Sequence, residues 1–487
     1  MRKVKYVICI LFALYVRDIN GKTIDKKQPP KQPNIVFFLI DDMGWKDLGC
    51  FGAQIYETPH IDRLCSDGVK FTNAYTSAPI CSPARASALT GSNPYSMRMW
   101  NHLHYIPTDK KLLPAYLKEV GYQTWHVGKW HIGNAEQHTY PQDKGFDINI
   151  GGGESWGPGS YFWPYNCNKD GSPRNIRNAI PGLYKNGKEG EYLNDRLTDE
   201  AFNIIENRDP DKPFFLNFWH YAVHNNKEAK ESVINKYKKK IRAYKLDTTY
   251  RTDNHVGGKL LTSETNATYA AMIESVDESI GRVVNKIKEI GEYENTLFIF
   301  YSDNGSTTED VPCAPLNGGK NTTYEGGVRV PAFVVWNNHT LPASTYRKAI
   351  YIGDVFETIL DAAQVKRETK TESYSWFPIF EGKELPNREF IWYYPVNREL
   401  RGQLASAAIY NEKLGMKYIM NFTSNKDELY DIQNDIAERD NIIANHKKEV
   451  TKLKTKLVSF MEEQYLKGLP LPPNKHRKNI ESRLNIK

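Results

Sequence analysis

Residues 34–42 read NIVFFLIDD, a mostly apolar run from Asn34 to Ile40 that leads directly into the acidic pair Asp41-Asp42. Three later segments repeat this arrangement of a β-prone apolar run that ends in polar residues. Runs without an alternating polar face predict strands of a sheet that is covered on both sides. The three are Gln123–Val127 before Gly128-Lys129-Trp130-His131, Phe214–Phe218 before His220 and His224, and Leu297–Tyr301 before Ser302-Asp303-Asn304-Gly305.

Helical patterns separate these runs, and together they indicate an α/β fold. The clearest is Tyr269–Ile290, in which Ile273, Val276, Ile280 and Val283 recur at helical spacing. Strands that alternate with helices predict a layered α/β domain with a large, mostly parallel sheet. Ligands of such sheets bind beyond the carboxyl ends of the strands, so we expect the four polar clusters to converge on one site.

The pattern changes after roughly residue 380, which predicts a main domain of residues 34–380 and a smaller α+β subdomain of residues 381–487 with a basic tail. A closing helix is expected with Val450, Leu453, Leu457 and Phe460 on one face and Gly468 as its stop. Short strands of an antiparallel sheet are expected at Glu389–Tyr394, Ala407–Tyr410 and Lys417–Asn421.

The first residues have the layout of a secretory signal peptide. Arg2, Lys3 and Lys5 precede an apolar run, Tyr6–Val16, and the segment ends near Gly21. The run is shorter than the ~20 residues of a membrane-spanning helix, so we expect cleavage and no membrane span in the mature chain. An uncleaved N-terminal anchor is the alternative. Residues 22–33, rich in Lys and Pro, are interpreted as a linker.

Further features favour the secretory pathway, with a lysosomal and an extracellular destination both open. Glycosylation sequons begin at Asn266, Asn321, Asn338 and Asn421. Outside the signal segment and Cys81, the cysteines are an even set that permits two disulfides in an oxidising compartment. That set is Cys50, Cys65, Cys167 and Cys313, and its three pairings stay open.

Composition excludes a disordered or fibrous protein, because a chain of 487 residues with 40% hydrophobic and 12% aromatic residues can bury a large core. The formal net charge of +7 is mild. It suits an anionic substrate, and we expect no nucleic-acid partner.

Two motifs carry the chemistry. The first is Cys81-Ser82-Pro83-Ala84-Arg85, continued by Leu89-Thr90-Gly91, and the second runs from Gly121-Tyr122-Gln123-Thr124 to Val127-Gly128-Lys129-Trp130-His131. They resemble the two signatures of the sulfatase family, although Ala88 is smaller than the residue usual there. Asp41-Asp42-Met43-Gly44, Ser302-Asp303-Asn304-Gly305 and Gly318-Gly319-Lys320 with Glu325–Pro331 extend the resemblance over the mature chain.

This resemblance implies an alkaline-phosphatase-like fold and a sulfuric ester hydrolase whose nucleophile is Cys81 after oxidation to formylglycine. A formylglycine-generating enzyme would be the partner in maturation, and the hydrated aldehyde would attack sulfur. A thiol would instead be trapped by sulfur transfer.

The resemblance also implies one calcium ion, held by residue 81 and by Asp41, Asp42, Asp303 and Asn304. A pair of aspartates at a strand end is costly without a cation, and a ligand set made only of oxygen favours a hard ion. Magnesium is the alternative ion. Taken alone, Asp41-Asp42 is also compatible with a helix N-cap, and Asp303-Asn304-Gly305 with a hairpin turn.

The remaining roles follow from motif position. Arg85 would hold the formylglycine, and Lys129 and Lys320 would neutralise the sulfate and the leaving oxygen. We expect His131 to act as the base that releases sulfate and His224 as the acid for the leaving alcohol. His220 competes with His224, because His224 lacks the Thr-Pro that often follows the family's histidine.

A Gly-rich and aromatic loop follows the second motif and is a candidate for the leaving-group pocket, since aromatic faces stack on sugars. Packing within the loop is the alternative. Sulfated sugars, including glycosaminoglycans, are the favoured substrates, whereas sulfolipids and small aryl sulfates stay open. Competing functions are a phosphate ester hydrolase of the same superfamily and an inactive glycan-binding relative with unmodified Cys81. The loop contains Gly151–Gly153, Trp156, Tyr161, Trp163 and Tyr165.

Overall fold

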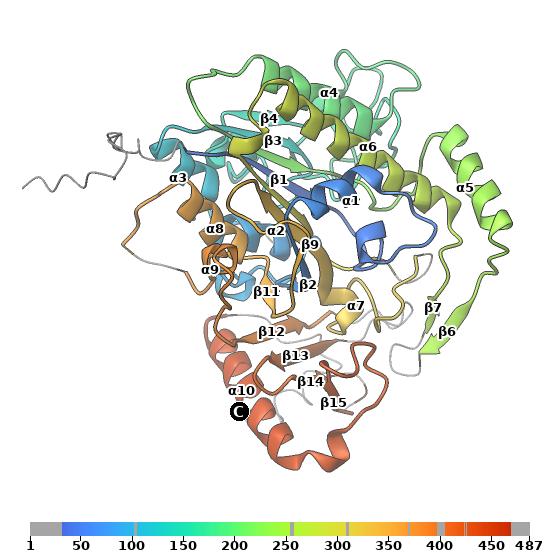
Figure 1. Cartoon of the computed structure of the whole chain (residues 1–487), viewed down its shortest axis with the longest axis vertical. Coiled ribbons are helices and arrows are strands. Elements are labelled where there is room, and N and C mark those ends of the chain that lie inside the picture. The colour runs from blue at the N-terminus through green and yellow to red at the C-terminus, as the bar shows by residue number, and fades with distance from the viewer. Residues whose placement is uncertain are drawn as a thin grey trace, which may run out of the picture.

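The computed structural model describes residues 32–101, 105–253, 258–307, 311–368, 371–396, 405–422, 424 and 426–468. The expected signal peptide, nearly all of the linker and most of the basic tail lie outside these residues. Figure 1 shows a large sheet wrapped by helices, with a second, smaller sheet and a long helix, α10, at one end of the molecule. Among the described residues, no helix has both the length and the apolar character needed to cross a membrane.

The main sheet has nine strands in the order β10-β2-β9-β8-β1-β5-β3-β4, with β11 also paired to β2. Every pairing is parallel except those of β9 with β8 and β2. The mostly parallel sheet is thus confirmed. Its strands are β1 (Asn34–Ile40), β2 (Val69–Tyr75), β3 (Gln123–Gly128), β4 (Ile148–Ile150), β5 (Phe214–Trp219), β8 (Thr296–Ser302), β9 (Arg329–Trp336), β10 (Ser344–Tyr346) and β11 (Ile350–Tyr351).

Helices cover both faces of this sheet, as the apolar strands predicted. In β1, Val36, Phe38 and Ile40 pack into a core with one group of helices. The alternating residues Ile35, Phe37 and Leu39 point to the opposite face and pack into a second core with the other group. The first group is α1 (Pro59–Ser66), α4 (Leu193–Glu206), α5 (Glu231–Ala243) and α6 (Ala267–Glu289), and the second is α2 (Cys81–Thr90), α3 (Leu113–Glu119), α8 (Asp354–Ala362) and α9 (Phe377–Phe380).

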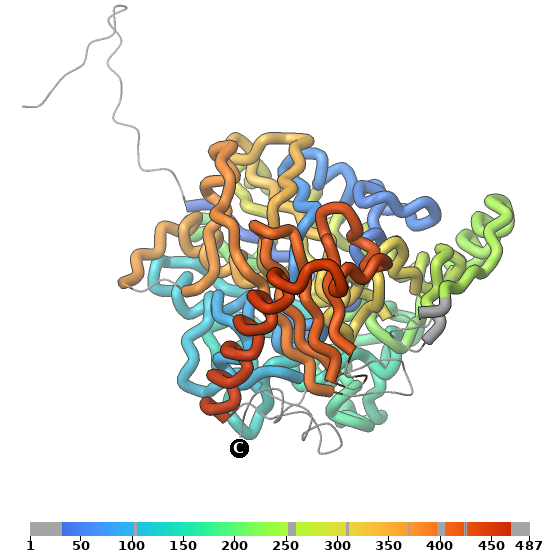
Figure 2. The backbone as a smooth tube through the Cα atoms, turned by 90° about the horizontal axis from the view of Figure 1, so that it is seen from below, coloured from blue at the N-terminus to red at the C-terminus, as the bar shows by residue number. Residues whose placement is uncertain are grey.

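A four-stranded antiparallel sheet forms the C-terminal part of the fold, as expected. Leu453, Leu457 and Met461 of α10 pack on one side of it, and Figure 2 shows this helix crossing the strands. The other side joins the main domain, where Trp392 and Tyr75 share an apolar cluster. The elements are β12 (Glu389–Tyr394), β13 (Ser406–Asn411), β14 (Met416–Asn421), β15 (Glu428–Asp431) and α10 (Lys447–Leu466); a hairpin of β6 (Tyr250–Asp253) and β7 (Gly258–Leu261) and the short helix α7 (Glu325–Val328) complete the fold.

Strand β9 contains a proline that would ordinarily argue against a central strand. Its register with β2 shifts between Phe71 and Ala74, which pair with Ala332 and Val330, so Pro331 lies opposite a bulge. The ladder with β8 ends at Ala332. The missing N–H therefore breaks no ladder hydrogen bond. Because β9 runs against its neighbours, its first residues lie at the edge where the other strands end.

The sequon asparagines differ in their accessibility. Asn338 is exposed, and Asn266 is half-buried at the N-terminus of α6, where its side chain accepts a hydrogen bond from the Tyr269 N–H. Asn321 and Asn421 are only 5% and 2% exposed. The folded chain has no room for a glycan at these two buried positions.

Candidate active site

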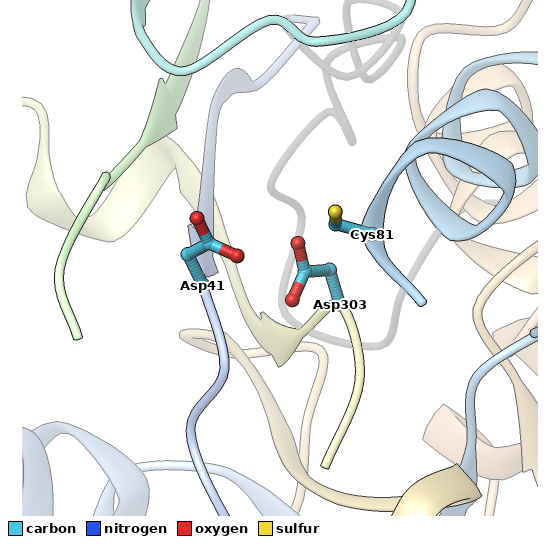
Figure 3. Close-up of side chains that lie close together, drawn as sticks. All are labelled: Asp41, Cys81 and Asp303. Atoms are coloured by element: carbon cyan, nitrogen blue, oxygen red, sulfur yellow. The ribbon is translucent and has the colours of Figure 1, made fainter. Parts of the chain in front are cut away.

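The polar residues that follow four parallel strands lie together at the carboxyl edge of the main sheet. Asp41 follows β1, Asp303 follows β8, and Cys81 is the first residue of α2. Carboxylate oxygens of Asp41 and Asp303 and the Cys81 Sγ lie within 4.8 Å of one another. Figure 3 shows the three side chains grouped at this point. Asp41 also forms an overlapping group with Asp42 and His224.

The acidic residues and Asn304 are linked by short contacts. The Asp42 N–H donates to Asp303 Oδ1 at 3.2 Å, and Asn304 Nδ2 donates to Asp42 Oδ1 at 2.7 Å. Asn304 Oδ1 and Asp41 Oδ1 are buried and accept no hydrogen bond from the described residues. Buried oxygens without donors are costly unless a cation binds them. This set of oxygen donors therefore fits a hard divalent ion such as calcium.

Each carboxylate also has a basic partner. Lys129 Nζ lies 2.5 Å from Asp41 Oδ2, and Lys320 Nζ lies 2.6 Å from Asp42 Oδ1. Arg85 completes the set, with Nη2 at 2.6 Å and Nε at 2.8 Å from Asp303 Oδ2. An anion that approaches the carboxylates or their cation thus meets both lysines.

The pKa values of the carboxyl groups reflect this balance. Burial raises the pKa of Asp303 to about 6, although Arg85 opposes the shift. Burial likewise raises the pKa of Asp41 against the effect of Lys129. For Asp42 burial is the largest single effect, but Lys320, His224 and Lys129 together outweigh it, so the pKa of Asp42 lies below the ordinary value. Each of the three carboxylates thus has a basic side chain within ion-pair distance.

Arg85 connects the helix of Cys81 to two strand ends. Besides Asp303, its guanidinium donates from Nη1 to the Lys129 carbonyl at 3.0 Å and lies 5.2 Å from the centre of the Trp219 ring. Cys81 and Arg85 are one helical turn apart on α2, so they share a face of that helix. Fixing Arg85 therefore fixes the direction in which Cys81 points.

The structure separates the three candidate histidines. His131 Nδ1 lies 3.3 Å from Cys81 Sγ. His224 Nε2 lies 3.7 Å from Asp42 Oδ2, and burial together with Lys320 lowers its pKa to about 3. His220 Nε2 contacts Ser279 Oγ of α6 at 2.9 Å, away from the carboxylates. His131 and His224 thus border the site, and His220 belongs to the packing of a helix.

Two glycines permit the close approaches that build the site. A Cβ atom on Gly128, whose φ is +101°, would lie 1.9 Å from the Trp219 carbonyl oxygen. A Cβ atom on Gly305 would lie 1.7 Å from the Gly326 carbonyl oxygen. Only glycine fits at either place, directly before Lys129 and directly after Asn304.

Supporting residues had no predicted role. Ser302 Oγ lies 3.1 Å from the Met43 N–H and 2.9 Å from the Asn304 carbonyl, and Thr76 Oγ1 donates to the Asp303 carbonyl at 2.5 Å. Ser302 belongs to the motif Ser302-Asp303-Asn304-Gly305, whereas Thr76 follows β2, a strand that the sequence did not predict. Trp219, beneath Arg85, could have been found as the residue directly after an apolar run.

The aromatic loop contributes one side chain to the site. The Trp156 ring stacks on His131 with 6.5 Å between ring centres. Trp163 stacks instead on Tyr184 at 5.6 Å, and Tyr161 and Tyr165 are fully buried in the core. Packing within the loop thus accounts for Trp163 and Tyr165, whereas the Tyr161 hydroxyl also donates to the His224 carbonyl at 2.9 Å. Of the four, Trp156 is the one whose ring stacks on a candidate catalytic side chain.

Comparison with known proteins agrees with this geometry. The sulfatase family model matches residues 33–365, and a model of the C-terminal region of N-sulphoglucosamine sulphohydrolase matches residues 319–465. Arylsulfatase J of Mus musculus is 30% identical over 378 residues, which cover 74% of this chain and 58% of that protein. N-acetylgalactosamine-6-sulfatase of Mus musculus is 31% identical over 363 residues, covering 69% of this chain and 64% of that protein.

The chain therefore spans about three fifths of the length of these curated relatives. Among solved structures, Ps i-CgsB, crystallised in complex with k-i-k-neocarrahexaose, superposes with a TM-score of 0.74 and 26% identity. That alignment covers 94% of this chain and 98% of the other. The similarity thus extends over both the main sheet and the C-terminal sheet.

Proposed function

The chain belongs to the sulfatase family, and from this premise we propose that it hydrolyses sulfate esters at the site around Cys81. The observation that carries the proposal is the grouping of the Cys81 Sγ with the carboxylates of Asp41 and Asp303, with His131 Nδ1 only 3.3 Å from that sulfur. A nucleophile, an acceptor for its proton and a set of cation ligands are thus present in one place.

We propose that Cys81 is oxidised to formylglycine during passage through the secretory pathway. The Cys81 Sγ then stands where a hydroxyl of the hydrated aldehyde would lie. That hydroxyl would attack sulfur and displace the alcohol. Loss of sulfate would later re-form the aldehyde, a route that is closed to a sulfonated cysteine thiol because it has no second hydroxyl.

Asp41, Asp42, Asp303 and Asn304 would hold the calcium ion. When bound, this ion would lower the pKa of the attacking hydroxyl and offset negative charge on the sulfate. Asn304 Oδ1 and Asp41 Oδ1 support this assignment, because each is buried and accepts no hydrogen bond from the residues that the structure describes.

The remaining residues have roles that suit their contacts. His224, at the border of the ligand cluster, would protonate the leaving alcohol once the negative charge of the bound sulfate ester raises its pKa. His131 would take the proton from the second hydroxyl of residue 81. Lys129 and Lys320 would bind sulfate oxygens, and Arg85 would orient residue 81 through its contacts with Asp303 and Lys129.

Sulfated sugars are the substrate class that we propose. One relative is an N-acetylgalactosamine-6-sulfatase and one solved neighbour holds a neocarrahexaose, so the family handles sugar ligands. The site lies beside Trp156, which reaches His131. We further propose secretion or lysosomal delivery after signal cleavage, in line with the exposed sequon at Asn338.

The mass of one tryptic peptide tests the proposal. Trypsin should release Phe71–Arg85, which contains Cys81 as its one cysteine. Protein secreted by a eukaryotic host should carry an aldehyde in place of the thiol and should hydrolyse 4-nitrocatechol sulfate. Cys81→Ala should retain the fold and lose turnover. An intact thiol together with absent sulfatase activity would favour a glycan-binding relative, and faster turnover of the matching phosphate ester would favour a phosphatase.

A further inference from the structure

A row of three stacked side chains leads from the nucleophile to the protein surface. His131 contacts Cys81, the Trp156 ring stacks on His131 with an interplanar angle of 17°, and the Arg177 guanidinium lies 5.1 Å from the centre of the Trp156 ring. Trp156 is half-buried and Arg177 is exposed. A cation is therefore presented to solvent on Trp156, one side chain away from His131.

Backbone hydrogen bonds hold this row in place. The Trp156 N–H donates to the Arg177 carbonyl at 2.7 Å, and the His131 N–H donates to the Gly153 carbonyl at 3.1 Å. The Arg177 N–H in turn donates to Asn175 Oδ1 at 3.0 Å. The position of Arg177 relative to the site is thus set by the main chain and by ring stacking, which reduces the entropy lost when it binds a ligand.

The same segment also reaches the other candidate histidine. A Cβ atom added to Gly157 would lie 2.3 Å from His224 Nδ1. Residues 153–157 therefore contact both His131 and His224, the two groups between which a sulfate ester would react. A leaving alcohol protonated by His224 has to lie against this segment, within the neighbourhood of Arg177.

Arg177 has no acidic partner of its own in the described part of the chain, where no carboxylate lies within 4.0 Å of its guanidinium. Glu154, in the same loop, accepts hydrogen bonds from the Tyr140 hydroxyl at 3.2 Å and from the Ala135 N–H at 3.4 Å. Among the described residues, no ion pair therefore occupies the guanidinium N–H groups of Arg177, which can donate to an external anion. A guanidinium is suited to carboxylates and sulfates, which it binds through two parallel hydrogen bonds.

We infer that Arg177, supported by Trp156, recognises a second anionic group on the leaving sugar, and hence that the substrate is an acidic sulfated glycan. The second group is a carboxylate or a further sulfate of the same or the adjoining sugar. This inference rests on the proposed sulfatase activity and makes Arg177 a specificity-determining residue. Because Trp156 contacts both His131 and Arg177, its ring serves as the support of the cation rather than as a platform for a sugar.

Competition experiments test the inference without knowledge of the natural substrate. Hydrolysis of 4-nitrocatechol sulfate is followed in the presence of three disaccharides: one with a uronate carboxylate and one sulfate, its carboxyl-reduced form, and one with two sulfates and no carboxylate. Arg177→Ala should weaken inhibition by the doubly anionic disaccharides by about 10- to 100-fold, the range of a hydrogen-bonded charge pair. Inhibition by the carboxyl-reduced form and the KM for the aryl sulfate should stay unchanged.

Matched variants sharpen the result. Arg174→Ala removes an exposed arginine from the same loop and should leave every inhibition constant unchanged. Arg177→Lys keeps the charge without the paired hydrogen bonds and should give an intermediate loss. The doubly anionic disaccharide whose inhibition constant changes more in Arg177→Ala identifies whether Arg177 binds a carboxylate or a second sulfate.

If Arg177→Ala changes the inhibition constants of all three disaccharides equally, or changes none of them, the inference is wrong. Continued hydrolysis of the aryl sulfate would in that case still support the proposed activity. A wild-type protein that carries formylglycine and still hydrolyses no sulfate would overturn the proposed activity and the inference together.

Discussion

His220 and His224 are four residues apart and contact different parts of the molecule. The ring of His224 lies 3.7 Å from the Asp42 carboxylate, whereas the ring of His220 contacts Ser279 of α6 at 2.9 Å and Phe218 at 4.3 Å between ring centres. The sequence left the choice between them open. The contacts assign His224 to the site and His220 to the core.

Substitution of the two histidines should therefore separate chemistry from stability. His224→Ala should lower kcat by about 100-fold or more for a sugar sulfate, whose alcohol needs a proton, and much less for a nitrophenyl sulfate with a good leaving group. His220→Gln should lower the midpoint of thermal unfolding and leave the ratio of the two kcat values unchanged. The reverse pattern would identify His220 as the acid.

Removal of calcium should abolish turnover and lower the unfolding temperature, because the buried carboxylates lose the cation that they bind. Asn304→Ala deletes a buried Oδ1 to which no described residue donates a hydrogen bond. It should weaken calcium binding by at least about tenfold, as expected for one lost oxygen ligand. Calorimetric titration of protein stripped with EDTA measures this affinity, with exposed Asn338→Ala as the control. An unchanged affinity in Asn304→Ala would remove Asn304 from the ligand set.

A buried ion network attaches the C-terminal sheet to the helix that follows Lys320. Lys417 Nζ lies 2.9 Å from Glu325 Oε1 and 3.0 Å from Glu438 Oε1, and all three side chains are fully or almost fully buried. Lys417→Met leaves both carboxylates without this cation and should lower the free energy of unfolding by about 3–5 kcal/mol.

Lys456, paired at the surface with Glu389, supplies the control for this network. Lys456→Met should cost less than about 1 kcal/mol, because solvent screens an exposed pair. Urea unfolding at pH 7 compares the two variants. Similar losses in both would show that burial of the Lys417 network adds nothing to stability.

Asp47 should give the protein a pH-dependent stability. Burial raises the pKa of Asp47 to about 7, against the effect of hydrogen bonds from the Tyr269 hydroxyl and the Gly44 N–H. The folded state thus keeps a proton that the unfolded chain releases above about pH 4. The associated stability is complete below pH 4 and is lost as the pH rises from about 4 to 7.

The Asp47→Asn variant has no carboxyl group to ionise at this position, so it should not lose this stability between pH 4 and 7. The free energy of unfolding of the variant minus that of wild type should therefore increase over this range, by at most about 4 kcal/mol. Urea titrations of both proteins at several pH values, with calcium constant, measure the difference. Two curves that stay parallel from pH 4 to 7 would contradict the raised pKa.

Cys50 and Cys65 should form a disulfide in an oxidising compartment. Their thiols are in hydrogen-bond contact, which raises the pKa of Cys50. Cys167 instead contacts the Tyr165 carbonyl, and Cys313 contacts Ser306. Tryptic mapping without reductant should recover Asp47–Arg63 joined to Leu64–Lys70. A peptide that joins Cys50 to Cys167 or Cys313 would show that a different pairing is correct.

The sequence predicted best those strands that are buried on both faces. The run Asn34–Ile40 has the bounds of β1, and Leu297–Tyr301 falls one residue short of β8 at each end. Strand β2 was not predicted, because Lys70, Thr72 and Asn73 are only half-buried and interrupt its apolar pattern. Strand β9 was hidden by Pro331, whose position opposite a bulge depends on the partner strand.

The sequence motifs predicted which residues belong to the site, but they could not predict which of these residues form ion pairs with one another. The assignment of Lys129 to Asp41 and of Lys320 to Asp42 depends on segments that meet only in the folded sheet. The stacking of Arg177 on Trp156 likewise joins two loop segments without periodicity. Local patterns carry no information on such contacts.

The order of strands in the main sheet limits the time at which Cys81 can be modified. In the folded chain Cys81 is 2% exposed, and Arg85 reaches Asp303, which lies 218 residues further along the chain. During synthesis, β1 cannot pair with β8 until β8 has been made. Arg85 of α2 likewise cannot bind Asp303 until that residue has been added to the chain. An enzyme that acts on the Cys81 thiol therefore has to reach it on the nascent chain, before the late strands close over it.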